Sequence, residues 1–201
     1  MNNGAGQSCV CAVFLDRDDT LIANNSLPPV PGQAPGDLCD PSRVELLPGA
    51  REACHQLARA GFRLIMFSNQ GVVARGGGTE QDVVRTNERV IELLEEGWDG
   101  DQLLIAGVYF CPFHPNGTVE PYNVEHPWRK PSPGMLLAAA EDHGIDLARS
   151  WVIGDADRDM EAGMNAGIPR EQYIRIGADV NKAILDAARE VIAHQSCQSG
   201  T

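Results

Sequence analysis

Short apolar runs alternate along the chain with segments in which apolar residues recur at helical spacing. The runs are rich in Val, Ile, Leu and Phe, and most of them stop at a polar residue or a glycine, which is typical of strands that are buried on both faces. This pattern predicts five strands, at residues 10–15, 62–67, 103–110, 150–154 and 173–176.

Helix signals fill the intervals between these strands. Glycines end three of the predicted helices, at Gly61, Gly144 and Gly167, and Thr79 begins another with a capping-box-like Thr79-x-x-Asp82. We predict helices at residues 48–60, 79–96, 133–144 and 179–193, and a shorter one that ends at Gly167.

Two longer segments show no clear period: residues 24–41, which are rich in Pro and Gly, and residues 111–130. Strands that alternate with helices favour a Rossmann-like α/β fold, a doubly wound parallel sheet of about five strands. No repeat or linker divides the chain, so we expect one domain over residues 1–201, with disordered ends at 1–7 and 195–201.

Charge narrows the possible partners. The chain of 201 residues has 16 basic and 28 acidic residues, a net charge of -12, and no basic run offsets the repulsion of nucleic acid. No apolar stretch approaches the roughly 20 residues that span a bilayer, and the N-terminus lacks the regions of a signal peptide. We expect a cytoplasmic monomer without a nucleic-acid or membrane partner. A phosphate ligand would need its own cations or a metal.

The cysteines are scattered over predicted strands, loops, helices and the tail. They form no C-x-x-C pair, and reduced structural thiols fit this pattern better than a disulfide framework does. The six are Cys9, Cys11, Cys39, Cys54, Cys111 and Cys197.

Polar residues gather where the predicted strands end. Asp16 and Asp18 follow the first strand at positions i and i+2, so their side chains point the same way and repel each other. Ser68 and Asn69 follow the second strand, and Asp155 follows the fourth. Because ligands bind beyond the carboxyl ends of parallel strands, we expect these side chains to converge.

Each of these residues also has a plain structural interpretation. Ser68 and Asn69 suit a turn, Asp155 suits a helix cap, and Lys130 suits a solvated surface charge. Their joint occurrence at successive strand ends favours a shared site. Carboxylates from two strands form an oxygen-rich site for Mg²⁺, and a hydroxyl and a lysine opposite them meet the needs of phosphoryl transfer.

Four motifs occur in the order found in the haloacid dehalogenase superfamily of phosphatases, which the chain resembles over most of its length. They are Asp16-Arg17-Asp18-Asp19-Thr20, Ser68-Asn69-Gln70, Lys130, and Gly154-Asp155-x-x-x-Asp159. The segments from Ser68 to Gly76 and from Arg129 to Met135 make the likeness closest to one branch, the heptose bisphosphate phosphatases and related histidinol-phosphatases. The chain has no insertion the size of the cap domain found in many members of this family, so we expect residues 24–41 and 111–128 to shape the pocket.

The resemblance also implies a role for each matching residue. Asp16 would be the nucleophile that forms an aspartyl-phosphate, and Asp18 the general acid and base. Mg²⁺ would bind Asp16, the backbone carbonyl of Asp18, and Asp155. Ser68 and Lys130 would orient the phosphoryl group, with Asp159 orienting Lys130 or the metal shell. The substrate contacts would be Asn69, Gln70, Arg75 and Arg129.

The chain departs from the family pattern at two places. Asp19 stands where the family commonly has Gly, and it would add a carboxylate next to Asp18 if it pointed inward. Where relatives often carry a zinc loop, Cys111, His114 and His126 form an incomplete ligand set, since structural zinc usually takes four. We therefore expect no zinc, and a loop that is ordered by packing of Phe113 and Trp128.

The resemblance predicts a phosphatase acting on a small phosphorylated substrate, most directly a sugar phosphate such as D-glycero-D-manno-heptose 1,7-bisphosphate. Three alternatives stay open at this point. They are a histidinol-phosphate phosphatase, a nucleic-acid 3′-phosphatase, which the net charge disfavours, and a phosphate-binding protein without turnover.

Overall fold

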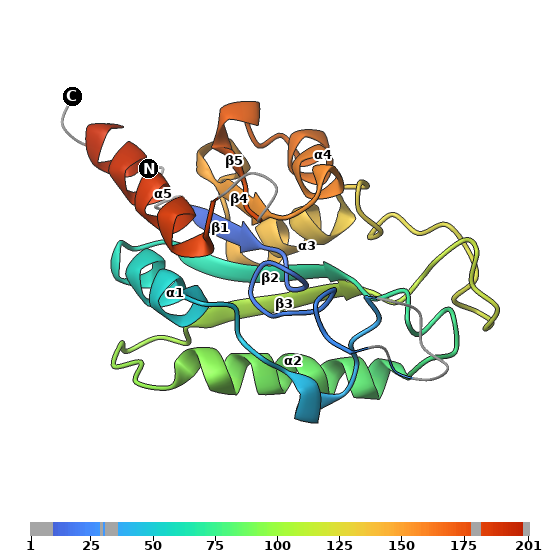
Figure 1. The fold of residues 1–201 in the computed structure, drawn as a ribbon. Coiled ribbons are helices and arrows are strands. Elements are labelled where there is room, and N and C mark those ends of the chain that lie inside the picture. Colours follow the sequence, from blue (N-terminus) through green and yellow to red (C-terminus); the bar gives the residue numbers. More distant parts are fainter. Residues whose placement is uncertain (1–9, 29, 31–35, 178–181, 199–201) are drawn as a thin grey trace, which may run out of the picture.

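A five-stranded parallel sheet forms the centre of the molecule, with its strands in the order β3-β2-β1-β4-β5 (Figure 1). The computed structural model describes residues 10–28, 30, 36–177 and 182–198. All five predicted strands are present, and the parallel α/β fold is confirmed. Their bounds are β1 (Ala12–Leu15), β2 (Arg63–Asn69), β3 (Ile105–Cys111), β4 (Trp151–Gly154) and β5 (Tyr173–Arg175).

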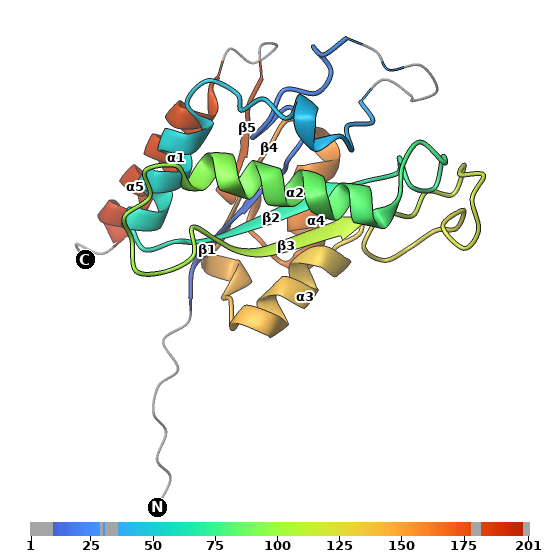
Figure 2. The same cartoon turned by 90° about the horizontal axis from the view of Figure 1, so that it is seen from below.

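Helices cover both faces of this sheet, as a doubly wound fold requires (Figures 1 and 2). Three of them, α1 (Ala50–Arg59), α2 (Glu80–Glu95) and α5 (Ile184–Gln198), pack on one face. The other two, α3 (Gly134–His143) and α4 (Asp157–Ala166), pack on the opposite face.

Strand β1 shows why its sequence is a continuous apolar run. Val13 and Leu15 join the core under α1, α2 and α5, whereas Ala12 and Phe14 join the core under α3 and α4. Because successive side chains of a strand point to opposite faces, both sets are buried.

The last helix differs from its prediction at both ends. Helix α5 begins at Ile184 rather than at residue 179, which lies outside the described residues. Gly177 and Lys182 pair in an antiparallel bridge, which turns the chain before the helix can start. The helix then continues to Gln198, past the predicted loose tail at 195. Residues 1–7 and 199–201, also predicted to be disordered, lie outside the described part.

The order in which the chain adds strands to the sheet reverses between β1 and β4. From β1 the chain adds β2 and β3 on one side, and it then crosses to add β4 and β5 on the other. Leu15 lies opposite Ile153, and the backbone N–H of Asp16 donates to the carbonyl of Ile153 at 3.0 Å. The carboxyl ends of β1 and β4 therefore lie side by side, which is where such sheets bind ligands.

Aromatic packing orders the segment between β3 and α3. The ring of Phe113 stacks on that of His126, with 4.2 Å between the centroids and 4° between the planes. Trp128 meets Tyr109 edge to face. This agrees with the prediction that Phe113 and Trp128 order the loop.

No helix in the described part of the chain is long and apolar enough to span a membrane. Within the same residues, Cys11, Cys39, Cys54 and Cys111 are free thiols.

Candidate active site

A buried lysine and two carboxylates form the centre of the site. The Lys130 Nζ lies 2.6 Å from Asp16 Oδ1, 2.7 Å from Asp159 Oδ1, and 4.3 Å from the centroid of the Phe67 ring. All three charged side chains are almost completely buried. The two carboxylates raise the pKa of Lys130 even though burial alone would lower it, so the ammonium stays charged.

Asp159 is held in place by the start of helix α4 as well as by Lys130. Its Oδ2 accepts a hydrogen bond from the backbone N–H of Ala156 at 3.1 Å, which completes a capping arrangement at the helix N-terminus. Gly154 makes room for it, because a Cβ at Gly154 would lie only 2.6 Å from Asp159 Oδ2. The geometry matches the expectation that Asp159 orients Lys130.

Three buried carboxylate oxygens at this site lack a hydrogen bond within the described residues: Asp16 Oδ2, Asp155 Oδ1 and Asp159 Oδ1. Of these, Asp159 Oδ1 has an ion-pair partner in Lys130. Burial raises the pKa of Asp16 to about 8 in the metal-free chain, with Asp159 and Asp18 adding to it and Lys130 opposing it. Burial also raises the pKa of Asp155, helped by Asp159. A cation between these oxygens would reverse both effects.

The donor set fits a hard divalent cation. One carboxylate oxygen each from Asp16, Asp155 and Asp159 lie within 4.8 Å of one another. Oxygen ligands of this kind suit Mg²⁺. Asp159 is already bound to Lys130 and Ala156, which leaves Asp16 and Asp155 as the ligands with oxygens to spare.

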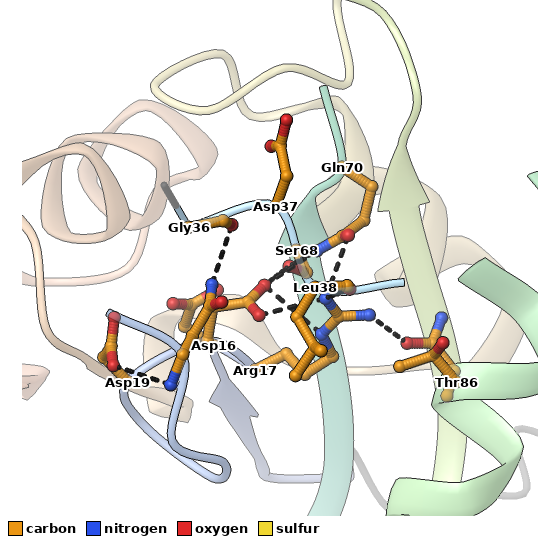
Figure 3. A network of polar contacts seen from close by, with 12 residues as sticks. Asp16, Arg17, Asp19, Gly36, Asp37, Leu38, Ser68, Gln70 and Thr86 are labelled. Carbon is orange, nitrogen blue, oxygen red and sulfur yellow. Dashed lines mark hydrogen bonds and ion pairs between the residues drawn. The ribbon is translucent and has the colours of Figure 1, made fainter. Parts of the chain in front are cut away.

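The guanidinium of Arg17 holds the carboxylate of Asp18 in place (Figure 3). It donates to both oxygens of Asp18, to the carbonyl of Leu38, and to the side chains of Gln70 and Asn87, at 2.8–3.2 Å. The side chain is fully buried. Arg17 therefore joins three parts of the chain that lie far apart in sequence.

Strand β2 and the residue that follows it supply the other contacts of Asp18. The Ser68 hydroxyl donates to Asp18 Oδ2 at 3.1 Å, and the Gln70 amide donates to the same oxygen and to Ser68 Oγ at 2.7 Å. Gln70 is buried and is not among the residues that line the pocket. The resemblance implied that Gln70 contacts the substrate. In the structure its side-chain amide instead donates to Asp18 and Ser68.

A pocket of about 280 Å³ opens over these groups at the carboxyl edge of the sheet. Most of the predicted site residues line it: Asp16, Asp18, Ser68, Asn69, Arg75, Arg129 and Lys130. The segment after β1 supplies another wall: Asp19, Asn24, Asn25, Gly36 and Asp37. A loop thus shapes this pocket, as expected for a chain without a large cap.

The predicted substrate residues are partly engaged within the protein. The side chain of Asn69 exchanges hydrogen bonds with the backbone N–H and carbonyl of Lys130, at 2.9 and 3.1 Å. The guanidinium of Arg75 donates hydrogen bonds to both carboxylate oxygens of the buried Asp37. Arg129 donates from one nitrogen to the carbonyl of Phe113 at 3.1 Å.

Asp19 anchors the loop that follows it and does not bond to Asp18. It adopts a left-handed conformation with φ = 55°, which explains why glycine suits this position. Its Oδ1 accepts hydrogen bonds at 3.0 Å from the backbone N–H groups of Asn24 and Asn25, and its Oδ2 accepts one from the Asn25 side chain.

We expect Asp19→Ala to destabilise the protein by about 1–2 kcal/mol, because alanine keeps the strained φ and leaves two backbone donors without their acceptor. Asp19→Gly relieves the strain but loses the same bonds, so its stability should lie between those of Asp19→Ala and the wild type. Urea unfolding measures the difference, with the exposed Asp99→Ala as a control of little effect. If Asp19→Gly is more stable than the wild type, relief of the strained φ outweighs the loop contacts and the prediction is wrong.

The zinc-type ligands do not come together. In the described part of the chain, Asp16, Asp155 and Asp159 are the one group of such side chains close enough to share an ion. Cys111 Sγ instead faces the carbonyl of Phe113, and the His126 ring is stacked on that of Phe113.

Several residues of the site were missed by the sequence analysis. Asn87 had a signal, because it lies on the buried face of α2 with Val83 and Val90, where a polar residue calls for a partner. Asp37 had none, since it lies in an irregular Pro- and Gly-rich segment. Arg158, another residue of the pocket wall, had none either.

Comparison with known proteins places this geometry in a family. A family model described as HAD-hydrolase-like matches residues 127–170. The D-glycero-β-D-manno-heptose-1,7-bisphosphate 7-phosphatase of Yersinia pestis is 35% identical over 172 residues, which are 85% of this chain and 84% of that protein. The protein of the same name from Escherichia coli K12 is 32% identical over 183 residues, 91% of this chain and 88% of that one.

Solved structures agree on the fold. A Mesorhizobium loti protein described as a HAD-like phosphatase superposes with a TM-score of 0.75 at 29% identity, covering 92% of this chain and 87% of that one. The D,D-heptose 1,7-bisphosphate phosphatase of B. bronchiseptica, solved with magnesium and phosphate, superposes with a TM-score of 0.68 at 20% identity, covering 92% of this chain and 99% of that one. The chain belongs to the haloacid dehalogenase-like phosphatases, in the branch that contains these heptose bisphosphate phosphatases.

Proposed function

We propose that the protein is a Mg²⁺-dependent phosphomonoesterase that acts through an aspartyl-phosphate on Asp16, and that its substrate is D-glycero-D-manno-heptose 1,7-bisphosphate. Residues 1–201 would act as one hydrolase domain. The observation that carries the chemistry is Asp16 itself, whose Oδ1 is held by Lys130 while its buried Oδ2 lacks a hydrogen bond beside Asp155. The relatives that are 32–35% identical support the substrate.

The first half of the reaction transfers the phosphoryl group to the protein. A carboxylate oxygen of Asp16 attacks phosphorus, and the bond from phosphorus to the sugar oxygen breaks. Asp18 gives its proton to that leaving oxygen. Lys130 fixes Asp16 and balances charge on the phosphoryl oxygens, and Ser68 donates a hydrogen bond to them.

The second half restores the protein. Asp18 takes a proton from a water molecule as that water attacks phosphorus, and the bond from phosphorus to Asp16 breaks to release inorganic phosphate. Asp16 and Asp155 would hold Mg²⁺, together with the Asp18 backbone carbonyl that the family resemblance implies. When bound, the cation neutralises carboxylate and phosphoryl charge.

Arg17, Gln70 and Asn69 act as positioning residues in this proposal. Arg17 and Gln70 hold the Asp18 carboxylate, and Asn69 holds the backbone of Lys130. Gln70 thereby takes a different role from the substrate contact predicted from the resemblance.

Phosphate release from a panel of substrates tests the function. With Mg²⁺ added to the metal-stripped protein, we expect kcat/KM for the heptose bisphosphate to exceed that for histidinol phosphate and for a 3′-phosphorylated oligonucleotide by at least about tenfold. Without Mg²⁺, turnover should fall to background. A preference for histidinol phosphate would overturn the substrate, and turnover that persists in a chelator would overturn the metal requirement.

A further inference from the structure

Four cationic side chains line the pocket, and two of them are already neutralised. Lys130 lies between Asp16 and Asp159, and Arg75 is bound by Asp37. Arg129 has a single hydrogen bond, to a neutral carbonyl. The fourth, Arg158, forms no hydrogen bond or ion pair with any described residue.

Arg158 is placed at the rim by the start of helix α4. It lies in the first turn, directly before Asp159, whose side chain is fully buried while that of Arg158 is exposed. The nearby carboxylates, Asp159 first, raise the pKa of Arg158 although burial opposes them. The guanidinium thus stays charged on the pocket wall.

Arg129 and Arg158 line the same pocket. Burial lowers the pKa of Arg129, and the positive charges of Arg75 and Arg158 act in the same direction. With Arg75 paired to Asp37, Arg129 and Arg158 are the two arginines of this pocket that form no ion pair with a described carboxylate. An anion between them would pair with both charges.

Contacts separate these two arginines from the reacting centre. Lys130 pairs with Asp16, and Ser68 donates to Asp18. Arg158 forms no hydrogen bond or ion pair with these carboxylates, and Arg129 donates to a neutral carbonyl. The two arginines therefore suit a second anionic group on the same substrate.

We propose that Arg158 determines specificity by binding a second phosphate of the substrate, remote from the one that is hydrolysed. The substrate class is a sugar bisphosphate, and Arg129 assists from the neighbouring wall. The proposal rests on the proposed phosphatase function of this pocket. The contribution of Arg158 to binding should therefore be seen with substrates that carry two phosphates and not with those that carry one.

The test compares bisphosphates with monophosphates that present the same reacting phosphate. The pairs are heptose 1,7-bisphosphate with heptose 7-phosphate, and fructose 1,6-bisphosphate with fructose 6-phosphate. For Arg158→Gln we expect kcat/KM for the bisphosphates to fall about tenfold or more, mainly through KM, while values for the monophosphates change less than about twofold. Arg158→Lys should retain part of the preference, since the charge stays but the paired donors are lost.

Arg149→Gln is the matched control. It removes the same charge from an exposed residue just before β4, at the opposite end of that strand from Asp155, and should leave both substrate classes unaffected. An equal loss for bisphosphates and monophosphates would overturn the proposal, because Arg158 would then act on the reacting phosphate. No loss for either class would overturn it as well.

The two proposals fail in different ways. If the wild type releases phosphate from none of these esters, the proposed function is wrong and the role of Arg158 fails with it. If the wild type is active but its ratio of bisphosphate to monophosphate kcat/KM is unchanged in Arg158→Gln, the function stands and the role of Arg158 is wrong.

Discussion

Asp16→Asn is expected to abolish turnover and to leave the metal-free protein at least as stable as the wild type. Asparagine has nearly the same shape, but its amide cannot attack phosphorus. Loss of the nucleophile should lower kcat by at least about a thousandfold, or about 4 kcal/mol in activation free energy.

The stability of this variant follows from the charge that it removes. In the metal-free wild type, Asp16 is buried near Asp159 and Asp18, and its pKa rises to about 8. The folded state therefore binds more protons than the unfolded state between pH 3.8 and about 8, so wild-type stability falls as the pH rises through this range. Asp16→Asn should flatten that dependence.

Two measurements check the prediction. Phosphate release with Mg²⁺ reports turnover, and thermal unfolding in a chelator at several pH values reports stability. Asp157→Asn is the control, because Asp157 is an exposed neighbour on α4 that pairs with Arg175 outside the pocket, and it should keep full activity. Turnover that survives Asp16→Asn would rule out an aspartyl-phosphate on this residue.

Lys130→Met is expected to remove both activity and much of the stability. Methionine fills a similar volume but leaves the buried carboxylates of Asp16 and Asp159 without their cation. Breaking a buried ion pair from one side costs about 3–5 kcal/mol. The pKa of Lys130 is raised above its ordinary 10.5, so its contribution is complete at neutral pH and is lost only as the pH rises above that value.

A second substitution keeps the test informative if Lys130→Met folds poorly. In the double variant with Asp159→Asn, one of the unpaired charges is gone, and the asparagine oxygen can still accept from Ala156. We expect this variant to regain about 1–3 kcal/mol of stability without regaining activity.

The other lysine of the chain provides the comparison. Lys182 pairs with Glu190 in a partly exposed ion pair, and Lys182→Met should cost less than about 1 kcal/mol. Urea unfolding gives these values. Equal losses from Lys130→Met and Lys182→Met would show that the buried lysine has no special structural role.

The elements of the fold were predictable, but their arrangement across the sheet was not. Apolar runs such as 62–67 and 150–154 identify strands by composition and length. They look alike, so nothing in them places β4 beside β1 rather than beside β3. That order depends on packing between distant helices and the sheet. The predicted start of α5 was too early, because Lys182 pairs with Gly177 in a bridge and the helix begins only at Ile184.

The convergence of side chains was predictable where the residues lie in short motifs at the ends of strands. Asp16 and Ser68 line one pocket because parallel strands bring their carboxyl ends together. Lys130, from the segment before α3, reaches the same pocket because its backbone is held by Asn69. Arg17 could not be placed in the same way, since arginine is seldom fully buried. Its burial depends on acceptors from Leu38 and Asn87, which only the folded chain brings within reach.

Asp159 limits how this protein can evolve. Its side chain both caps the start of helix α4 and pairs with the buried Lys130, and a side chain at position 154 would collide with it. Selection for stability and, under the proposed function, selection for turnover therefore both act on position 159. A mutation there affects both properties at once. Arg158, its neighbour in sequence, is exposed and has neither of these contacts, so under the proposed function it can be substituted without disturbing Asp159.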